Sequence, residues 1–118
     1  MLSQAKIKRN QRIMITLNTF LEKNGEISDE ELATLLNNYG IKTSHSTVDR
    51  DLSINLIKMF KEHNLNKISS GELDKCFVND KGLTDKEMDI YAFIIKKRRD
   101  NKKYGQIRGG QKGGSYVK

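Results

Sequence analysis

The sequence predicts a mainly α-helical fold, with a helix-turn-helix three-helix bundle followed by a C-terminal helix and a basic flexible tail. The 118 residues include no Pro and no Trp and are rich in Lys, Asn, Ile and Leu, which favours helices over a turn-rich β fold. Apolar residues recur at helical spacing in several segments. We expect the bundle over residues 1–63, a helical region over 64–103 and a Gly-rich tail over 104–118.

The first expected helix covers residues 3–23 and ends at Asn24-Gly25. We expect it to pack across the next two helices as the third helix of the bundle. Its basic first half either touches a phosphate backbone or is a solvated charged face. The predicted apolar stripe consists of Ile7, Ile13, Met14, Leu17, Phe20 and Leu21.

The second expected helix begins after Ser28, a good N-cap residue. Glu31 stands three residues later and can complete a capping box, and Ile27 can contact Leu32 as a hydrophobic staple. Gly40 can adopt the left-handed conformation that ends a helix. The apolar residues at helical spacing are Leu32, Leu35, Leu36 and Tyr39, which we expect to lie in the core.

The third expected helix begins near Thr43 or Ser44, and Val48 and Leu52 form its buried side. Polar residues near its N-terminus are left facing outward, as in a recognition helix that meets base edges and phosphates. An ordinary helical hairpin with a polar surface fits the same periodicity. The outward residues are Ser44, His45, Ser46, Thr47, Asp49 and Arg50.

Residues in this segment resemble two families of bacterial DNA-binding proteins. The run from Glu31-Leu32 to Leu52, with Gly40-Ile41 and Arg50-Asp51, is similar to the DNA-binding domain of arginine repressors. Ser46-Thr47-Val48-x-x-Asp51-Leu52 resembles the stage III sporulation protein D family, and Ile107-Arg108-Gly109-Gly110 is a shorter second match to it. The resemblance implies a bacterial transcription regulator that binds double-stranded DNA with a helix-turn-helix and a basic C-terminal segment.

The region after Leu52 differs from both families. The apolar residues from Ile54 to Phe60 extend the recognition helix to about Glu62, or form a new helix after a break at Ser53 or Asn55. Residues 64–70 are expected to form a turn, and residues 71–78 are a short segment of undecided type. No clear alternation of apolar and polar residues indicates the two-stranded wing of arginine repressors.

The last expected helix begins at a second capping box, formed by Thr84 and Glu87, with Leu83 and Met88 as its staple. It should run to about Lys103. Its apolar side is expected to consist of Met88, Tyr91, Ala92, Ile94 and Ile95.

The positive charge of the chain is concentrated in residues 96–118. Nine basic residues stand there against Asp100 alone, a net charge of +8, whereas 13 basic and 14 acidic residues give the rest a net charge of −1. Phosphates would attract this segment, and its glycines would let the backbone follow a DNA groove. A merely solubilising tail is the alternative. The predicted DNA-contacting residues are Lys42, Thr43, Ser44, His45, Ser46, Thr47, Asp49, Arg50, Lys96, Lys97, Arg98, Arg99, Lys102, Lys103, Arg108 and Lys112.

Other classes of function have little support in the sequence. His45 and His63 form no metal-site pattern, and the single Cys76 has no partner cysteine for a disulfide or a structural zinc site. We therefore expect neither an enzyme, nor a cofactor, nor a small-molecule ligand. No signal peptide or membrane-spanning run is apparent, so we expect a soluble cytoplasmic protein. The alternative functions are a plasmid or phage accessory or architectural DNA-binding protein, and an RNA- or protein-binding module.

Overall fold

The computed structural model describes residues 3–112, with side chains up to residue 100, and this part of the chain contains helices and no strands. The predicted mainly α fold is confirmed, and no two-stranded wing follows residue 52 within the described residues. The elements are α1 (Gln4–Glu22), α2 (Asp29–Asn38), α3 (His45–Arg50), a π-helical turn η1 (Asp51–Asn55), α4 (Leu56–Ser69), a 3-10 turn η2 (Lys75–Phe77) and α5 (Asp85–Lys112).

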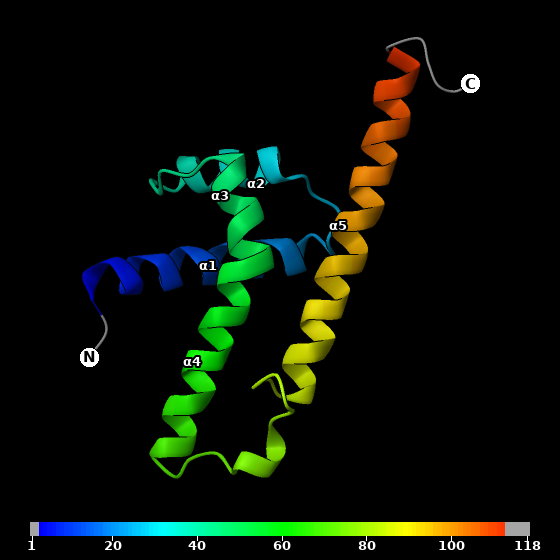
Figure 1. Cartoon of the computed structure of the whole chain (residues 1–118). Coiled ribbons are helices and arrows are strands. Elements are labelled where there is room, and N and C mark those ends of the chain that lie inside the picture. Colours follow the sequence, from blue (N-terminus) through cyan, green and yellow to red (C-terminus); the bar gives the residue numbers. More distant parts are fainter. Residues whose placement is uncertain (1–2, 113–118) are drawn as a thin grey trace.

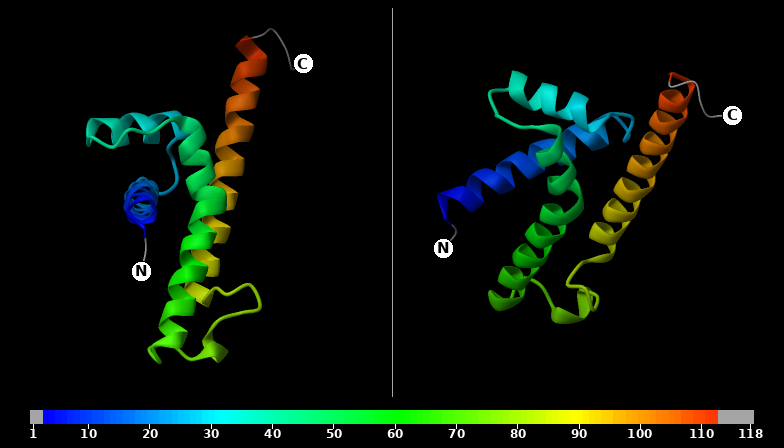
Figure 2. Two further views of the ribbon diagram at one scale, coloured as in Figure 1. Left: turned by 60° about the vertical axis from the view of Figure 1, so that its left-hand side comes forward. Right: turned by 45° about the horizontal axis from the view of Figure 1, so that its top comes forward.

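The elements α3, η1 and α4 follow one another as one long helix (Figure 1). Helix α5 runs beside it in the opposite direction, so that the N-terminus of α3 and the C-terminal half of α5 lie at the same end of the molecule. Figure 2 shows α1 crossing the long helix, with α2 packed above α1. The bundle therefore combines the helix-turn-helix with a long helical hairpin.

The helix starts follow the predicted capping chemistry. Ser28 Oγ accepts from the backbone N–H of Glu31, and the Glu31 carboxylate accepts from the backbone N–H of Ser28, both at 3.1 Å. The hydrogen bond from the Ser28 backbone stabilises the charged carboxylate, so it lowers the pKa of Glu31. Thr84 and Glu87 form the second capping box in the same way. Gly40 has a φ of 85° after α2, as a left-handed helix end requires.

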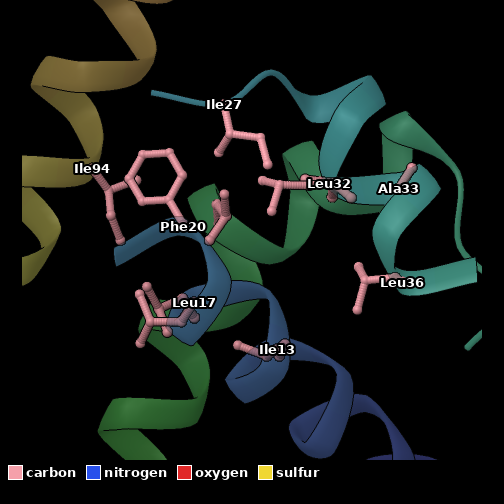
Figure 3. Packing of buried hydrophobic residues seen from close by; sticks show 11 residues of the cluster. Ile13, Leu17, Phe20, Ile27, Leu32, Ala33, Leu36 and Ile94 are labelled. Carbon is pink, nitrogen blue, oxygen red and sulfur yellow. The ribbon is translucent and has the colours of Figure 1, made fainter. Parts of the chain in front are cut away.

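The core lies where α1, α2, the long helix and α5 meet (Figure 3). Phe20 and Phe93 meet edge to face, with ring centroids 6.1 Å apart. The predicted buried positions of Val48 and Leu52 are confirmed, as both side chains have no exposed surface. The buried cluster consists of Ile13, Leu17, Phe20, Ile27, Leu32, Ala33, Leu36, Val48, Leu52, Leu56 and Ile94.

The predicted core was wrong at several positions. Helix α1 buries Thr16 and Thr19 in place of three expected apolar residues, and the Thr16 hydroxyl donates to the carbonyl of Arg12 at 2.8 Å. A Thr that satisfies its hydroxyl within the helix can face a core, so the buried face of α1 is rotated from the predicted stripe. Helix α5 likewise packs Ile90 and Phe93 on the core. The residues wrongly expected inside are Ile7, Met14, Leu21, Tyr39, Ala92 and Ile95, all of which are exposed.

The long helix continues without a break to Ser69, which corrects the predicted turn over residues 64–70. Asn64 explains the error, because this polar residue is buried. Its Nδ2 donates at 2.8 Å both to the Gly82 carbonyl and to Glu87 Oε1 at the start of α5. A polar segment can therefore be helical where one of its side chains, here that of Asn64, is buried and hydrogen-bonds to a neighbouring helix.

The π turn also affects the packing of the long helix. Residues four apart drift around a regular α-helix, because each turn takes 3.6 residues. The backbone N–H of Leu56 instead bonds the carbonyl of Asp51, five residues earlier, which widens this turn. The wider turn reduces the drift, so Val48, Leu52 and Leu56 all reach the same core.

Helix α5 runs to Lys112, so the predicted helix end near Lys103 is wrong. Gly lowers helix propensity but keeps the N–H donor that Pro lacks, so the helical ladder can pass Gly105 and Gly109. Basic residues near a helix C-terminus are also favourable. The rest of the predicted tail, residues 113–118, lies outside the described residues.

Candidate nucleic-acid interface

The turn between α2 and α3 is fixed by the side chain of Asn37. Its Nδ2 donates to the carbonyls of Ala33 and Thr43, both at 2.7 Å, and its Oδ1 accepts from the backbone N–H of Thr43 at 3.3 Å. The Thr43 hydroxyl donates to the Ile41 carbonyl at 3.1 Å. Thr43 is therefore half-buried in the turn, whereas the neighbouring Lys42 is exposed. Sequence reasoning missed Asn37.

The N-terminal part of α3 carries the exposed polar residues. Ser44 caps the helix, since its Oγ accepts from the backbone N–H of Thr47 at 3.2 Å and lies 3.1 Å from the Thr47 hydroxyl. These contacts hold Thr47 half-buried at the first turn. His45, Ser46 and Arg50 are exposed, and no side-chain hydrogen bond engages them within the described part of the chain. Their donors and acceptors are thus available to a partner.

A buried ion pair sets the orientation of the long helix on α1. Arg12 Nε donates to Asp51 Oδ2 at 2.6 Å, and Arg12 Nη2 donates to Asp51 Oδ1 at 3.0 Å. Asn55 Nδ2 donates to the same Oδ1 at 2.8 Å. The Asp51 side chain has no exposed surface. The hydrogen bond between Arg12 and Asp51 is the main cause that raises the pKa of Arg12. This network anchors the helix just after the exposed residues of α3, and sequence reasoning assigned no such role to Arg12 or Asp51.

On the opposite side of α3, two predicted DNA-contacting residues of α5 are paired within the chain. Arg98 donates to Asp29, at the start of α2, and to Asp49 of α3. Lys97 Nζ donates to Glu26 Oε2 at 3.1 Å and lies 5.9 Å from the centroid of the Phe93 ring. Its alkyl chain also covers Gly25, where an added Cβ would approach Lys97 Cγ to 2.6 Å. These contacts fix α5 against the helix-turn-helix.

Between α3 and α5 lies an open groove of about 890 Å³. His45, Ser46, Asp49 and Arg50 line it from α3, and Arg98 and Arg99 line it from α5. Three carboxylates also line this groove, those of Asp29, Glu30 and Asp49. Arg98 partly neutralises Asp29 and Asp49, so it weakens their repulsion of a polyanion. The structure therefore brings these six predicted residues together along one groove.

The remaining predicted residues lie elsewhere. Lys42 lines a separate groove beside α1, and the exposed Lys96 does not line the groove between α3 and α5. Lys102, Lys103, Arg108 and Lys112 belong to the part of α5 whose backbone alone is described, so their side chains lie outside the described residues.

Within the described residues, no three His, Cys, Asp or Glu side chains gather where they could hold a metal ion. None of the helices in this part of the chain is long and apolar enough to cross a bilayer. Compared with the models of protein families, with curated proteins and with solved structures, the chain shows no match in any of the three.

Proposed function

We propose that the chain is a sequence-specific DNA-binding transcriptional regulator. The N-terminal residues of α3 would read base edges in the major groove, and the basic end of α5 would grip the neighbouring backbone or minor groove. One observation carries the proposal: the exposed His45, Ser46 and Arg50 of α3 line the same groove as the basic residues Arg98 and Arg99 of α5. This groove lies at the end of the molecule where α5 projects.

Arg50 is the residue best suited to read a base. It is exposed at the end of α3, and no ion pair holds its guanidinium within the described residues. A guanidinium can donate two parallel hydrogen bonds to O6 and N7 of guanine. His45 and Ser46, one turn earlier, add shorter donors and acceptors.

Helix α5 would supply affinity without reading sequence. Its last 14 residues, 99–112, follow Arg98, the last ion-paired residue among the described side chains, and extend about 21 Å as a helix. Double-stranded DNA carries one phosphate charge per about 1.7 Å of its axis, so a helix of this length can pass several phosphates. The ion pairs of Arg98 would set the direction in which this segment leaves the bundle.

The first experiment selects bound sites from random duplex DNA with the full chain and then compares the selected duplex with RNA of equal length. The proposal expects an enriched motif and tighter binding to the duplex. Tighter binding to RNA would contradict it and favour an RNA-binding module. A duplex bound without an enriched motif would favour an accessory or architectural protein.

The Arg50→Ala variant tests the assigned base contact. We expect it to weaken binding to the selected site by about 1–3 kcal/mol, while affinity for unrelated duplex DNA changes much less. Lys58→Ala is the matched control, because Lys58 is an exposed basic residue of α4, about two turns after Arg50 along the long helix. An equal loss on both duplexes would make Arg50 a phosphate contact, and no loss would exclude α3 as the recognition helix.

A further inference from the structure

A second groove, of about 960 Å³, lies between the N-terminal half of α1 and the turn that follows α2. Ile7, Met14, Ile15 and Ile41 supply apolar surface, and Ile7 and Met14 are about two-fifths exposed (37% and 41%). Contiguous apolar surface rimmed by polar residues is typical of protein interaction sites. No acidic residue is among the side chains that line this groove in the described part of the chain.

The charges around this groove are unbalanced. Three basic residues of α1 are paired within the chain: Lys6 and Arg9 contact Glu62 at 3.1 and 3.3 Å, and Arg12, which also lines the groove, contacts Asp51. Lys8 and Lys42 also line the groove, are exposed and form no ion pair among the described residues. The groove thus combines an apolar floor with two uncompensated positive charges.

We propose that this groove binds an acidic amphipathic helix of a partner protein. Such a helix would bury its apolar face on Ile7, Met14 and Ile41 and place its carboxylates near Lys8 and Lys42, a helix-in-groove mode of recognition. Charge complementarity selects this occupant. Nucleic acid phosphates would gain little from the apolar floor, and a second copy of the chain would bring a like net charge of +7.

The position of the groove makes this site separate from the proposed DNA-binding surface. The N-terminal half of α1 extends away from α5 (Figure 1), whereas the groove between α3 and α5 lies on the other side of the long helix. Binding of a partner helix here does not rest on the proposed function.

The probe is a synthetic peptide of about 16 residues, roughly 24 Å as a helix, with Leu on one face and Glu on the others. In a scrambled peptide of the same composition, the Leu residues no longer lie on one face of the helix. A third peptide keeps the Leu face and replaces every Glu by Lys. The methyl resonance of Met14 reports on the groove, and those of Met59 and Met88 serve as internal references. We expect a saturable shift of the Met14 resonance with the amphipathic acidic peptide alone.

The double variant Lys8→Glu/Lys42→Glu should bind the acidic peptide at least about tenfold more weakly, because two attractions become repulsions. Lys58→Glu/Lys86→Glu is the matched control, with two exposed lysines on α4 and α5. Thermal melting verifies that both variants fold. Equal binding by the two variants, equal binding of the Lys peptide, or a Met14 shift with duplex DNA but not with the acidic peptide would overturn the proposal.

Discussion

Two arginines join helices in this bundle, and they do so in different surroundings. Arg12 connects α1 to the long helix through Asp51, whose side chain is fully buried. Arg98 connects α5 to α2 and α3 through Asp29 and Asp49, whose side chains are 25% and 61% exposed. The comparison shows how burial separates a contact that determines the fold from one that adjusts a surface.

The physical reason is the cost of leaving a carboxylate without partners. Asp51 cannot reach water, so the three donors from Arg12 and Asn55 replace its hydration. If Arg12 is removed, the charge stays buried and uncompensated. Asp29 and Asp49 both keep some contact with solvent, where water replaces a lost partner and salt screens the charge.

The largest expected effect is that of Arg12→Ala. We expect a loss of about 3–5 kcal/mol in the free energy of unfolding, because the buried Asp51 loses its charged partner. Arg98→Ala is the matched control and should cost no more than about 1 kcal/mol. Chemical denaturation of the two variants measures both values. Equal losses of unfolding free energy in the two variants would show that burial does not decide how much each contact contributes to stability.

The loss of a buried side chain that carries no charge itself should fall between these two values. Asn64→Ala leaves the Gly82 carbonyl without its side-chain donor and should lower the free energy of unfolding by about 1–3 kcal/mol. Asn66→Ala, at an exposed position of α4, is the control and should have little effect. The same denaturation experiment applies. A loss as large as that of Arg12→Ala would show that removing an uncharged buried donor costs as much as removing a charged one.

Local chemistry explains which parts of the fold could be predicted. Ser28 with Glu31 and Thr84 with Glu87 are signals contained within four residues, and both helix starts follow them. The core of α1 could not be predicted as well, because an apolar pattern does not reveal that Thr16 bonds its own helix and faces inward. Likewise, nothing near Asn64 in the sequence indicates its partner at Gly82.

In the candidate interface too, contacts between residues far apart in the sequence could not be predicted. The sequence indicated that Ser44, His45 and Arg50 lie near the start of an exposed helix, and these residues are exposed there. It did not indicate that Arg98 reaches Asp29 and Asp49, which lie 69 and 49 residues earlier in the chain. Such contacts depend on how helices pack, and only the assembled bundle brings them together.

The smallest expected effect on folding is that of deleting residues 105–118. Ile94 is the last buried residue among those whose side chains are described, so we expect the free energy of unfolding to stay unchanged. The deletion removes Arg108, Lys112 and Lys118 and no acidic residue. Each neutralised phosphate adds about −0.9 to the slope of log affinity against log salt, so under the proposed function the slope should become shallower by roughly two to three units.

Titrations of the full and shortened chains with duplex DNA at several salt concentrations measure this slope. The matched control is the full-length chain with Arg108→Gln, Lys112→Gln and Lys118→Gln, which keeps the backbone and removes the same charges. If charge alone acts, the control and the deletion should give the same slope, and the preferred site should shift only modestly, because base reading is assigned to α3. An unchanged slope in both would mean that this segment stays off the DNA. A large loss of stability in the deletion would show instead that the end of α5 belongs to the packed bundle, as Ile94 does.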